Sequence, residues 1–319
     1  MDEPAIVIDG VSKSFGSTRA VRDMSLVVPR GIVCGFLGPN GAGKSTTIRM
    51  IMSIIYPDGG RIAVLGGSAL SAKDRIGYLP EERGLYRKMR VGDFLAYMAR
   101  LKGVSSRGLH QRIEAWLERM ELPGVVRRRC SELSKGMQQK VQFIAALVHE
   151  PELVILDEPF SGLDPVNAEV MRTVIQEQRD AGRTVIFSTH IMQSAERLCD
   201  RLVLINRGEK LLDATMDEIR ARFSPRTVVA DPIEAATDAA RIADGLPGVV
   251  GARVADDGIE VSLAEDGDPQ VVMAGLLKAA PLRRVGVRRV TLEEVFVRLV
   301  RRGGGEAAAA EAERELTSA

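Results

Sequence analysis

The sequence reads Gly38-Pro39-Asn40-Gly41-Ala42-Gly43-Lys44-Ser45, and Thr46 follows. The stretch matches the P-loop pattern in its required context, because the apolar run Ile32–Leu37 predicts a strand before it and a helix is predicted from Lys44 to about Ile55. Glycines let the backbone wrap around phosphate oxygens, so that its amides point inward and the helix N-terminus adds a favourable field. We expect Lys44 to supply charge to the β- and γ-phosphates of a nucleotide and Ser45 to offer its hydroxyl to Mg²⁺. Eight matching positions with correct flanks argue against a chance glycine-rich turn.

A pair of carboxylates supplies the second half of the predicted nucleotide site. Leu153–Leu156 is an apolar run that predicts a buried strand, and Asp157 and Glu158 follow at its C-terminal end. Ligands bind at that edge of a parallel sheet. Asp157 suits the ligand shell of Mg²⁺, and Glu158 suits a residue that orients or deprotonates an attacking water. Alone, the pattern would be an ordinary strand ending in an acidic turn; after a P-loop it indicates a catalytic site.

Further motifs resemble those of the ABC ATPases, in the order typical of that family. Leu133-Ser134-Lys135-Gly136-Met137-Gln138 resembles the family signature, usually written LSGGQ, and Ser161-Gly162-Leu163-Asp164 looks like its D-loop. Thr189-His190 looks like the end of the strand that carries the switch histidine, and Phe15 stands where the family places an aromatic residue under the adenine. The resemblance covers about residues 4–222 and implies an ATP-binding and ATP-hydrolysing subunit of a transporter.

The resemblance also implies how such a subunit works. Two subunits sandwich two ATP molecules head to tail, and the P-loop of one faces the signature of the other. Ser134 and Gly136, which open a helix, would present a hydroxyl, amides and the positive end of a dipole to the γ-phosphate, and His190 would contact the same group. The implied partners are an integral-membrane permease and a second ATPase chain, either identical to this one or different. The resemblance to a bacterial branch with separate permeases favours export, with ATP and Mg²⁺ as cofactors.

Two departures from the family pattern bear on the site. Lys135 and Met137 replace glycine and glutamine in the signature, but Ser134 and Gly136, the positions that contact phosphate, are retained. The second departure is Glu81, which stands where the family has a glutamine that reaches Mg²⁺ and water. A carboxylate can bind Mg²⁺ but cannot donate a hydrogen bond. We therefore leave two readings open, in which Glu81 either ligates Mg²⁺ or lies in a solvent-facing turn.

Other side chains also allow two interpretations. Phe15 in Ser14-Phe15-Gly16 is predicted to stack on adenine, with simple packing as the alternative. The arginine cluster in the C-terminal region is interpreted as the solvated face of an edge strand, with a basic patch for lipid headgroups or nucleic acid as the alternative; its members are Arg283, Arg284, Arg288 and Arg289. We assign no role to His110 or His149.

The pattern of apolar runs predicts an α/β architecture with two domains. Residues 4–222 form a P-loop ATPase core with an antiparallel β subdomain near the N-terminus and a helical insertion over residues 90–150. Residues 226–302 show the order β-α-β-β-α-β, which is typical of a ferredoxin-like fold. Thr291 with Glu294 predicts a capping box at the start of a last helix. Residues 303–319, rich in Gly, Ala and Glu, are predicted to be a flexible tail.

Composition bounds the location and the function class. The formal net charge of +1 favours no nucleic-acid partner, and no run approaches the roughly 20 apolar residues of a membrane-spanning helix. The acidic start, Met1-Asp2-Glu3-Pro4, does not look like a signal peptide, so we expect a cytoplasmic protein held at the inner face of the cell membrane by its permease. The gap from Lys44 to Leu133 is too short for the coiled coil of chromosome-maintenance ATPases. An ABC-type ATPase with a non-transport regulatory role remains the alternative.

Overall fold

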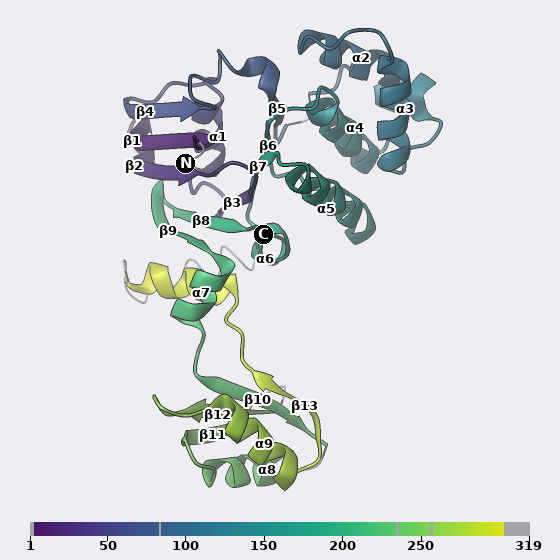
Figure 1. Cartoon of the computed structure of the whole chain (residues 1–319). Coiled ribbons are helices and arrows are strands. Elements are labelled where there is room, and N and C mark those ends of the chain that lie inside the picture. The colour runs from purple at the N-terminus through teal and green to yellow at the C-terminus, as the bar shows by residue number, and fades with distance from the viewer. Residues whose placement is uncertain (1–2, 83, 234–235, 256–257, 303–319) are drawn as a thin grey trace. The chain divides into compact units, whose positions relative to one another are not determined.

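The computed structural model describes residues 3–82, 84–233, 236–255 and 258–302, so the predicted tail at 303–319 lies outside the described residues. The chain divides into two compact units (Figure 1), each described by itself. The first unit comprises Met1–Met216 together with the segment that begins at Phe296, and the second comprises Asp217–Val295. The first unit thus ends at Met216, where the sequence predicted a boundary at 222. The chain returns to the first unit at Phe296, within the predicted C-terminal domain 226–302.

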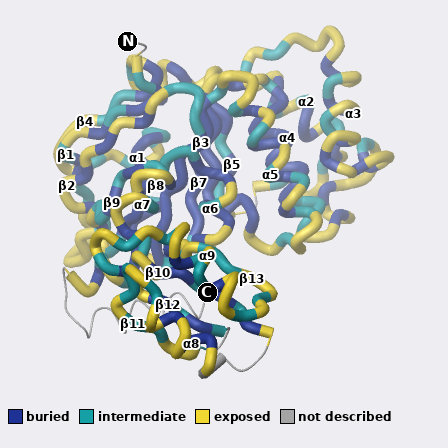
Figure 2. The backbone as a smooth tube through the Cα atoms, turned by 60° about the horizontal axis from the view of Figure 1, so that its bottom comes forward, coloured by how far each residue is buried: buried dark blue, intermediate teal, exposed yellow. Residues whose placement is uncertain are grey.

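A six-stranded sheet with the order β5-β6-β7-β3-β8-β9 forms the centre of the first unit. Its first five strands are parallel, and β9 is antiparallel to β8. Every residue of the middle strands β3, β6 and β7 is buried (Figure 2), which explains why these strands read as unbroken apolar runs. The strands are β3 (Val33–Leu37), β5 (Ile76–Leu79), β6 (Leu153–Asp157), β7 (Thr184–Thr189), β8 (Arg201–Asn206) and β9 (Glu209–Thr215).

A helix follows directly or after a short loop on each of three parallel strands. α1 (Lys44–Ile51) begins directly after the P-loop, and α5 (Pro165–Asp180) and α6 (Met192–Leu198) follow β6 and β7. The predicted extension of α1 to about Ile55 is wrong, because the helix ends at Ile51 and Ser53 adopts a positive φ of 55°. A residue in that left-handed region cannot continue a right-handed helix.

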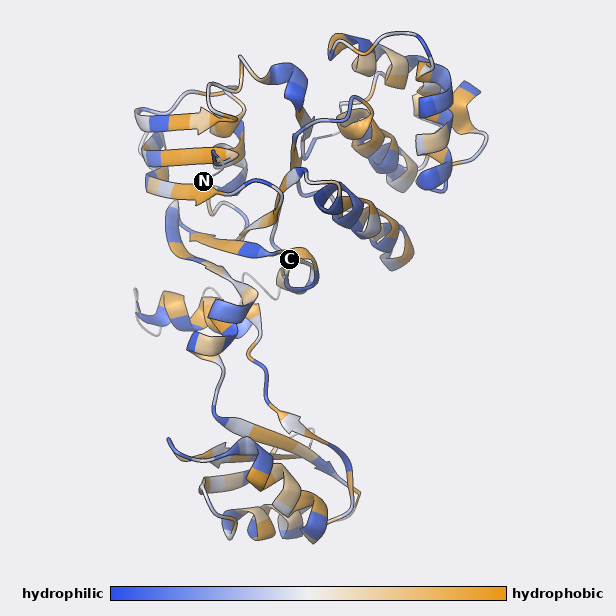
Figure 3. Ribbon diagram, in the orientation of Figure 1, coloured by the Kyte–Doolittle hydropathy of each residue, from blue (hydrophilic) through white to orange (hydrophobic). Residues whose placement is uncertain are grey.

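An antiparallel sheet of three strands, with the order β2-β1-β4, is the second sheet of the first unit. Its members are β1 (Ile6–Phe15), β2 (Thr18–Val28) and β4 (Gly59–Val64), whose inner residues are apolar (Figure 3). Ile6 of β1, Ile48 of α1 and Phe36 of β3 belong to one buried cluster, so α1 shares a core with both sheets. The predicted antiparallel subdomain is confirmed, with β1 and β2 longer than their apolar runs.

The predicted helical insertion contains α2 (Val91–Leu101), α3 (Leu109–Arg119) and α4 (Lys135–Leu147), which lie together near β5 in Figure 1. Short 3₁₀ turns precede and connect these helices at Lys73–Arg75, Val125–Arg127 and Cys130–Glu132. α4 begins at Lys135, as the resemblance implied for a helix opened by Ser134 and Gly136. Ser134 caps it: its hydroxyl accepts a hydrogen bond of 3.3 Å from the amide of Met137. None of the helices within the described ranges combines the length and apolar character needed to cross a bilayer.

The second unit opens with α7 (Met216–Phe223) and then has the predicted ferredoxin-like order. Four antiparallel strands form a sheet with the order β11-β12-β10-β13, and α8 and α9 pack on one of its faces through Ala239, Ala243, Val272 and Leu276. The turn of the predicted hairpin at Asp256-Asp257 lies outside the described residues. The bounds are β10 (Thr227–Pro232), α8 (Ala236–Asp244), β11 (Val249–Ala255), β12 (Gly258–Leu263), α9 (Pro269–Ala279) and β13 (Leu282–Val287).

The last described helix, residues 292–302, begins with the predicted capping box. The amide of Glu294 donates to the hydroxyl of Thr291 at 3.3 Å, and the amide of Thr291 donates to the carboxylate of Glu294 at 3.2 Å. The two bonds satisfy amides that would otherwise be unpaired at the helix start.

Candidate functional site

The loop between β3 and α1 has a backbone that only glycine permits at two positions. Gly38 has φ 153° and Gly43 has φ 104°. A Cβ atom on Gly38 would lie 2.0 Å from the carbonyl oxygen of Ile205, and one on Gly43 would lie 2.4 Å from the carbonyl oxygen of Ala20. The neighbouring strands therefore approach the loop so closely that these glycines are required for its shape.

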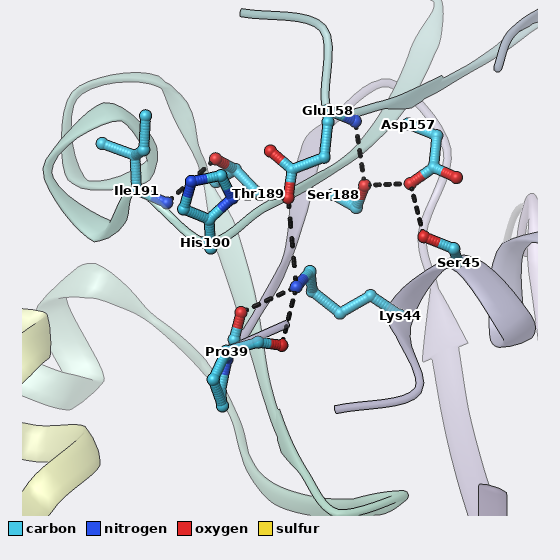
Figure 4. Close-up of polar contacts among 10 residues, drawn as sticks. Pro39, Lys44, Ser45, Asp157, Glu158, Ser188, Thr189, His190 and Ile191 are labelled. Carbon is cyan, nitrogen blue, oxygen red and sulfur yellow. Dashed lines mark hydrogen bonds and ion pairs between the residues drawn. The ribbon is translucent and has the colours of Figure 1, made fainter. Parts of the chain in front are cut away.

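Lys44 is buried at the centre of this loop (Figure 4). Its ammonium donates to the carbonyl oxygens of Gly38 and Pro39 at 2.7 and 3.0 Å, and it lies 3.9 Å from the carboxylate of Glu158. Burial lowers the pKa of Lys44, while the negative charges of Glu158, Asp157 and Glu81 act to raise that pKa. The three carboxylates therefore all act on one cation within the site.

Asp157 ends β6 beside two hydroxyl groups. Oδ1 of Asp157 accepts hydrogen bonds from Ser45 at 3.0 Å and from Ser188 at 2.5 Å, while its buried Oδ2 has no hydrogen-bond partner among the described residues. Ser188 also accepts a bond of 3.1 Å from the amide of Glu158. Sequence reasoning missed Ser188; the signal for it was its position at the end of the strand next to β6, where it pairs in register with Asp157.

The side chain of Glu158 points to a different group of residues from that of Asp157. Its φ is +48°, a sparsely populated value for a residue with a side chain, and its side chain points at His190 and Lys44 (Figure 4). Nδ1 of His190 lies 2.9 Å from Oε1 of Glu158, and Glu158 is only 7% exposed. Strained backbone of this kind is retained where the surrounding structure enforces it, often at active sites. Carboxylate, imidazole and ammonium thus meet at one point.

A cavity of ≈ 260 Å³ collects most of the predicted nucleotide-binding residues. Glu81 is exposed yet lines this cavity, together with Glu158 and Ala20, and sequence reasoning did not single out Ala20. Phe15 is 52% exposed and is not among the lining residues; the ammonium of Lys13 lies 5.6 Å from its ring centre. The lining residues are Ala20, Asn40, Gly41, Ala42, Gly43, Lys44, Ser45, Thr46, Glu81 and Glu158.

The signature residues are absent from the described lining of this cavity and form a separate surface. Ser134 and Lys135 are exposed at the start of α4, and the amide group of Gln138 donates to the carbonyl oxygens of Cys130 and Leu133 at 3.2 and 3.1 Å. A Cβ atom on Gly136 would contact Leu163 of the predicted D-loop at 3.4 Å. The signature and the D-loop are therefore neighbours.

Asp164 of the predicted D-loop starts α5. Its carboxylate accepts a hydrogen bond of 2.9 Å from the amide of Asn167, and this bond, with one from the Asn167 side chain, lowers the pKa of Asp164. Ser161, Gly162 and Leu163 lead into this cap. The last residue of the predicted D-loop, Asp164, is therefore the N-cap of α5, and its carboxylate fixes the start of that helix.

Comparison with known families matches two regions of the chain. Residues 21–161 match the family model described as "ABC transporter", and residues 215–300 match "ATP-binding protein DrrA1-3-like, C-terminal domain". The second match spans the ferredoxin-like unit. Both kinds of domain are thus found where the structure places its two units.

Individual relatives match over most of the chain. "Uncharacterized ABC transporter ATP-binding protein YhaQ" of Bacillus subtilis (strain 168) is 37% identical over 92% of this chain and 98% of that protein. "Nod factor export ATP-binding protein I" of Rhizobium sp. (strain N33) is 34% identical over 95% of this chain and 99% of that protein. A solved structure, "Structure of ATP binding subunit of ABC transporter", is 32% identical with a TM-score of 0.64 and covers 69% of this chain and 93% of that chain.

Proposed function

The chain belongs to the ATP-binding proteins of ABC transporters, and from that premise we propose that it hydrolyses ATP between two subunits to drive export through a separate permease. Binding and hydrolysis of ATP are the activity of this family. The meeting of Glu158 with His190 at 2.9 Å, beside Lys44, is the observation that carries the proposal. In the proposed site, Glu158 would act as the base, His190 as a polar contact and Lys44 as the phosphate-binding cation.

In the proposed mechanism, Glu158 holds the attacking water and His190 orients Glu158 and contacts the γ-phosphate. The constrained backbone and the bond from the Glu158 amide to Ser188 keep this carboxylate in place. Lys44 exchanges its contacts with the Gly38 and Pro39 carbonyl oxygens for phosphate oxygens as ATP binds. Positioning and charge stabilisation supply most of the catalysis in phosphoryl transfer.

The residues beside the P-loop fit Mg²⁺. Asp157 offers a buried oxygen that has no hydrogen-bond partner among the residues the structure describes, and the hydroxyl of Ser45 lies against the same carboxylate. Proteins usually bind Mg²⁺ through one or two carboxylates together with waters and substrate phosphates. When bound, Mg²⁺ neutralises charge on the β- and γ-phosphates. Ser45 and Asp157 would hold it, and Glu81 is placed to join them or to bind a water of its shell.

A second ATPase chain would complete the site. Ser134, Lys135 and Gly136 are accessible at the start of a helix and are not needed by the cavity of their own chain. Met137 and Gln138 continue this turn. Such a helix start offers amides and a hydroxyl to a phosphate presented by a partner. A pair of identical chains is the simplest assembly, and a related chain would serve equally.

An aromatic surface supports a permease contact. The ring of Tyr86, at the end of the loop that carries Glu81, lies 5.8 Å from the ring of Tyr97 and 6.1 Å from that of Phe94. Tyr86 is 52% exposed and Tyr97 is 41% exposed. Exposed aromatic groups of this kind are typical of protein interfaces. Through this contact the chain would sit at the inner face of the cell membrane. The name of the Nod factor export relative supports export.

The test compares Glu158→Gln with wild type. The variant keeps the side-chain shape but loses the carboxylate, so we expect ATP binding to persist and hydrolysis to fall about 10²- to 10⁴-fold, as is typical of lost general-base assistance. Phosphate release and nucleotide binding are measured on the same preparations. Glu118→Gln, an exposed position on α3, serves as the matched control. Hydrolysis at the wild-type rate in Glu158→Gln would show that another group is catalytic.

A further inference from the structure

The second unit has a hollow on the sheet face opposite α8 and α9. The hollow has a volume of ≈ 580 Å³ and centres on β13. Side chains alternate between the two faces of a strand, so Arg284, Gly286 and Arg288 share one face and Val285 takes the other. Val285 packs against the core that α8 and α9 cover, which places Arg284 and Gly286 on the open face, and Arg288 and Arg289 follow the end of the strand. The lining residues are Ser224, Val229, Arg284, Val285, Gly286, Val287, Arg288 and Arg289.

Gly286 keeps the floor of the hollow open. It pairs in register with Val229 of β10, and a Cβ atom built on Gly286 would meet nothing within 4 Å. Arg284 and Arg288 are four residues apart on an extended chain, about 13 Å at the usual rise of a strand. Two long side chains at that distance stand on either side of a floor made by a glycine and a valine. The sequence Arg-Val-Gly-Val-Arg-Arg therefore builds a shallow site rather than a ridge.

The charge of the hollow is unbalanced. Its lining includes three arginines and no carboxylate. Arg288 is held by Glu260 at 3.2 Å and by Glu294 at 2.5 Å. Arg284 and Arg289 form no ion pair or hydrogen bond with any residue in the described part of the chain, and the nearby Asp231 is engaged by Arg283 at 3.6 Å. Glu260 pairs in register with Val229 and therefore lies on the same face of the sheet, where it neutralises Arg288, while the guanidinium groups of Arg284 and Arg289 are left for a ligand.

We propose that this hollow binds a phosphate group, presented either by a soluble phosphorylated molecule or by a phospholipid headgroup. The guanidinium group binds phosphate oxygens through paired N–H donors, which gives affinity and orientation together. The hollow lacks the aromatic side chains on which proteins stack the bases of single-stranded nucleic acid. This site is separate from the nucleotide site, which uses residues of the first unit alone.

The test measures binding of pyrophosphate to the full chain by calorimetry, in a Lys44→Ala background that weakens binding at the P-loop. Gly286→Val fills the floor without changing charge, and the double change Arg284→Ser with Arg289→Ser removes the free guanidinium groups. We expect each to weaken binding about 10- to 100-fold, the range for loss of a hydrogen bond to a charged group. Arg241→Ser, an exposed position on α8 that removes one positive charge from the covered face, should bind as tightly as its parent.

Flotation with vesicles distinguishes the two sources of phosphate. If phosphatidylglycerol vesicles retain the protein through Arg284 and Arg289 and phosphatidylcholine vesicles do not, the ligand is a headgroup; pyrophosphate binding without flotation assigns it to a soluble molecule. Thermal denaturation of each variant verifies folding. Arg284→Gln replaces the double arginine change if that protein does not fold. Equal affinity in all variants, an equal loss in Arg241→Ser, or no binding by the parent to either probe would overturn the proposal. So would tighter binding of a single-stranded oligonucleotide than of pyrophosphate.

Discussion

Asp157 and Glu158 are adjacent, yet the structure directs them to different tasks. Asp157 ends a regular strand and points at the hydroxyl of Ser45, whereas Glu158, with φ +48°, points at His190 and Lys44. Ser188 ties the two together, because one hydroxyl group contacts both residues. The change of backbone direction at Glu158 thus separates a proposed metal ligand from the proposed base next to it in the sequence. Ser188→Ala would therefore disturb both groups at once.

Glu81 is the residue on which the sequence left two readings open. Because it lines the cavity with Lys44 and Glu158, we expect Glu81→Ala to reduce hydrolysis about 10- to 100-fold, the range seen when a group near a metal is removed. Glu81→Gln, which keeps the length and an oxygen ligand, should remain active, and ATP affinity should change little in both. Steady-state hydrolysis and nucleotide binding measure the two effects. Wild-type activity in both variants would support the solvent-facing reading.

His149 is a residue to which the sequence gave no role. Burial, followed by the charge of Lys102, lowers the pKa of His149 to about 4, and its Nε2 lies 3.2 Å from the carbonyl oxygen of Ile76. As the pH falls below about 6.5, the unfolded chain takes up a proton at this residue that the folded chain refuses, so the free energy of unfolding decreases until the pH approaches 4.

We therefore expect the wild type to lose about 1–2 kcal/mol of stability between pH 7.5 and 5 through His149, allowing for its partial exposure. His149→Gln should lose that much less over the same range. Urea denaturation at the two pH values measures the difference. His110→Gln serves as the control, because His110 is 73% exposed and paired only with Glu114. The same pH dependence in all three proteins would contradict the assignment.

At the scale of elements, α4 connects the exposed residues of the predicted signature to the turn after β6, which carries the proposed base. Ser134 caps the helix at the surface, and further along it the buried side chain of Gln139 donates to the carbonyl oxygen of Pro159 at 3.1 Å. Pro159 directly follows Glu158. A nucleotide held against the start of α4 would therefore act on a helix that contacts the turn after the catalytic carboxylate.

The signature surface gives a prediction about assembly. Because Glu158→Gln should bind ATP but hydrolyse it slowly, we expect it to accumulate as an ATP-bound dimer. Ser134→Arg places bulk and charge where a partner's nucleotide would lie, so we expect it to abolish that dimer while each chain still binds ATP. Size-exclusion chromatography with light scattering, in ATP and Mg²⁺, separates the two states. Ser131→Arg, an exposed change three residues earlier, should leave the dimer intact. A dimer that survives Ser134→Arg would mean that the signature does not face the partner.

The sequence predicted elements well where hydrophobic burial produces a pattern. The middle strands β3, β6 and β7 read directly as apolar runs, and the capping box at Thr291 was visible as two residues. The short strand β5 was missed, because Ile76-Gly77-Tyr78-Leu79 mixes glycine into four residues. Hydrophobic periodicity did not reveal the start of α4, because its first turn is polar; the resemblance of Ser134 and Gly136 to the family signature implied that start. The role of Ser188 depends on which strands become neighbours, and one sequence does not reveal that.

At the scale of the whole molecule, the second unit is an insertion with adjacent ends. The amide of Arg288 donates to the carbonyl oxygen of Thr227 at 2.8 Å, so the chain enters β10 beside the point where it leaves β13. Deletion of residues 224–290, with a short Gly-Ser bridge, should therefore leave a protein that folds and binds ATP as tightly as the full chain. Every residue that lines the nucleotide cavity lies in the first unit. A folded deletion protein without ATP affinity would make the second unit part of the nucleotide site.

The return of the chain to the first unit also constrains its synthesis. Phe296 is fully buried and belongs with Met1–Met216, but the ribosome adds 217–295 before reaching it. At about 5–20 residues per second, those residues take roughly 4–16 s. During that interval, the nascent first unit lacks a buried side chain and presents apolar surface to chaperones. A premature stop codon anywhere between 217 and 295 would thus damage the ATPase unit as well as the unit it interrupts.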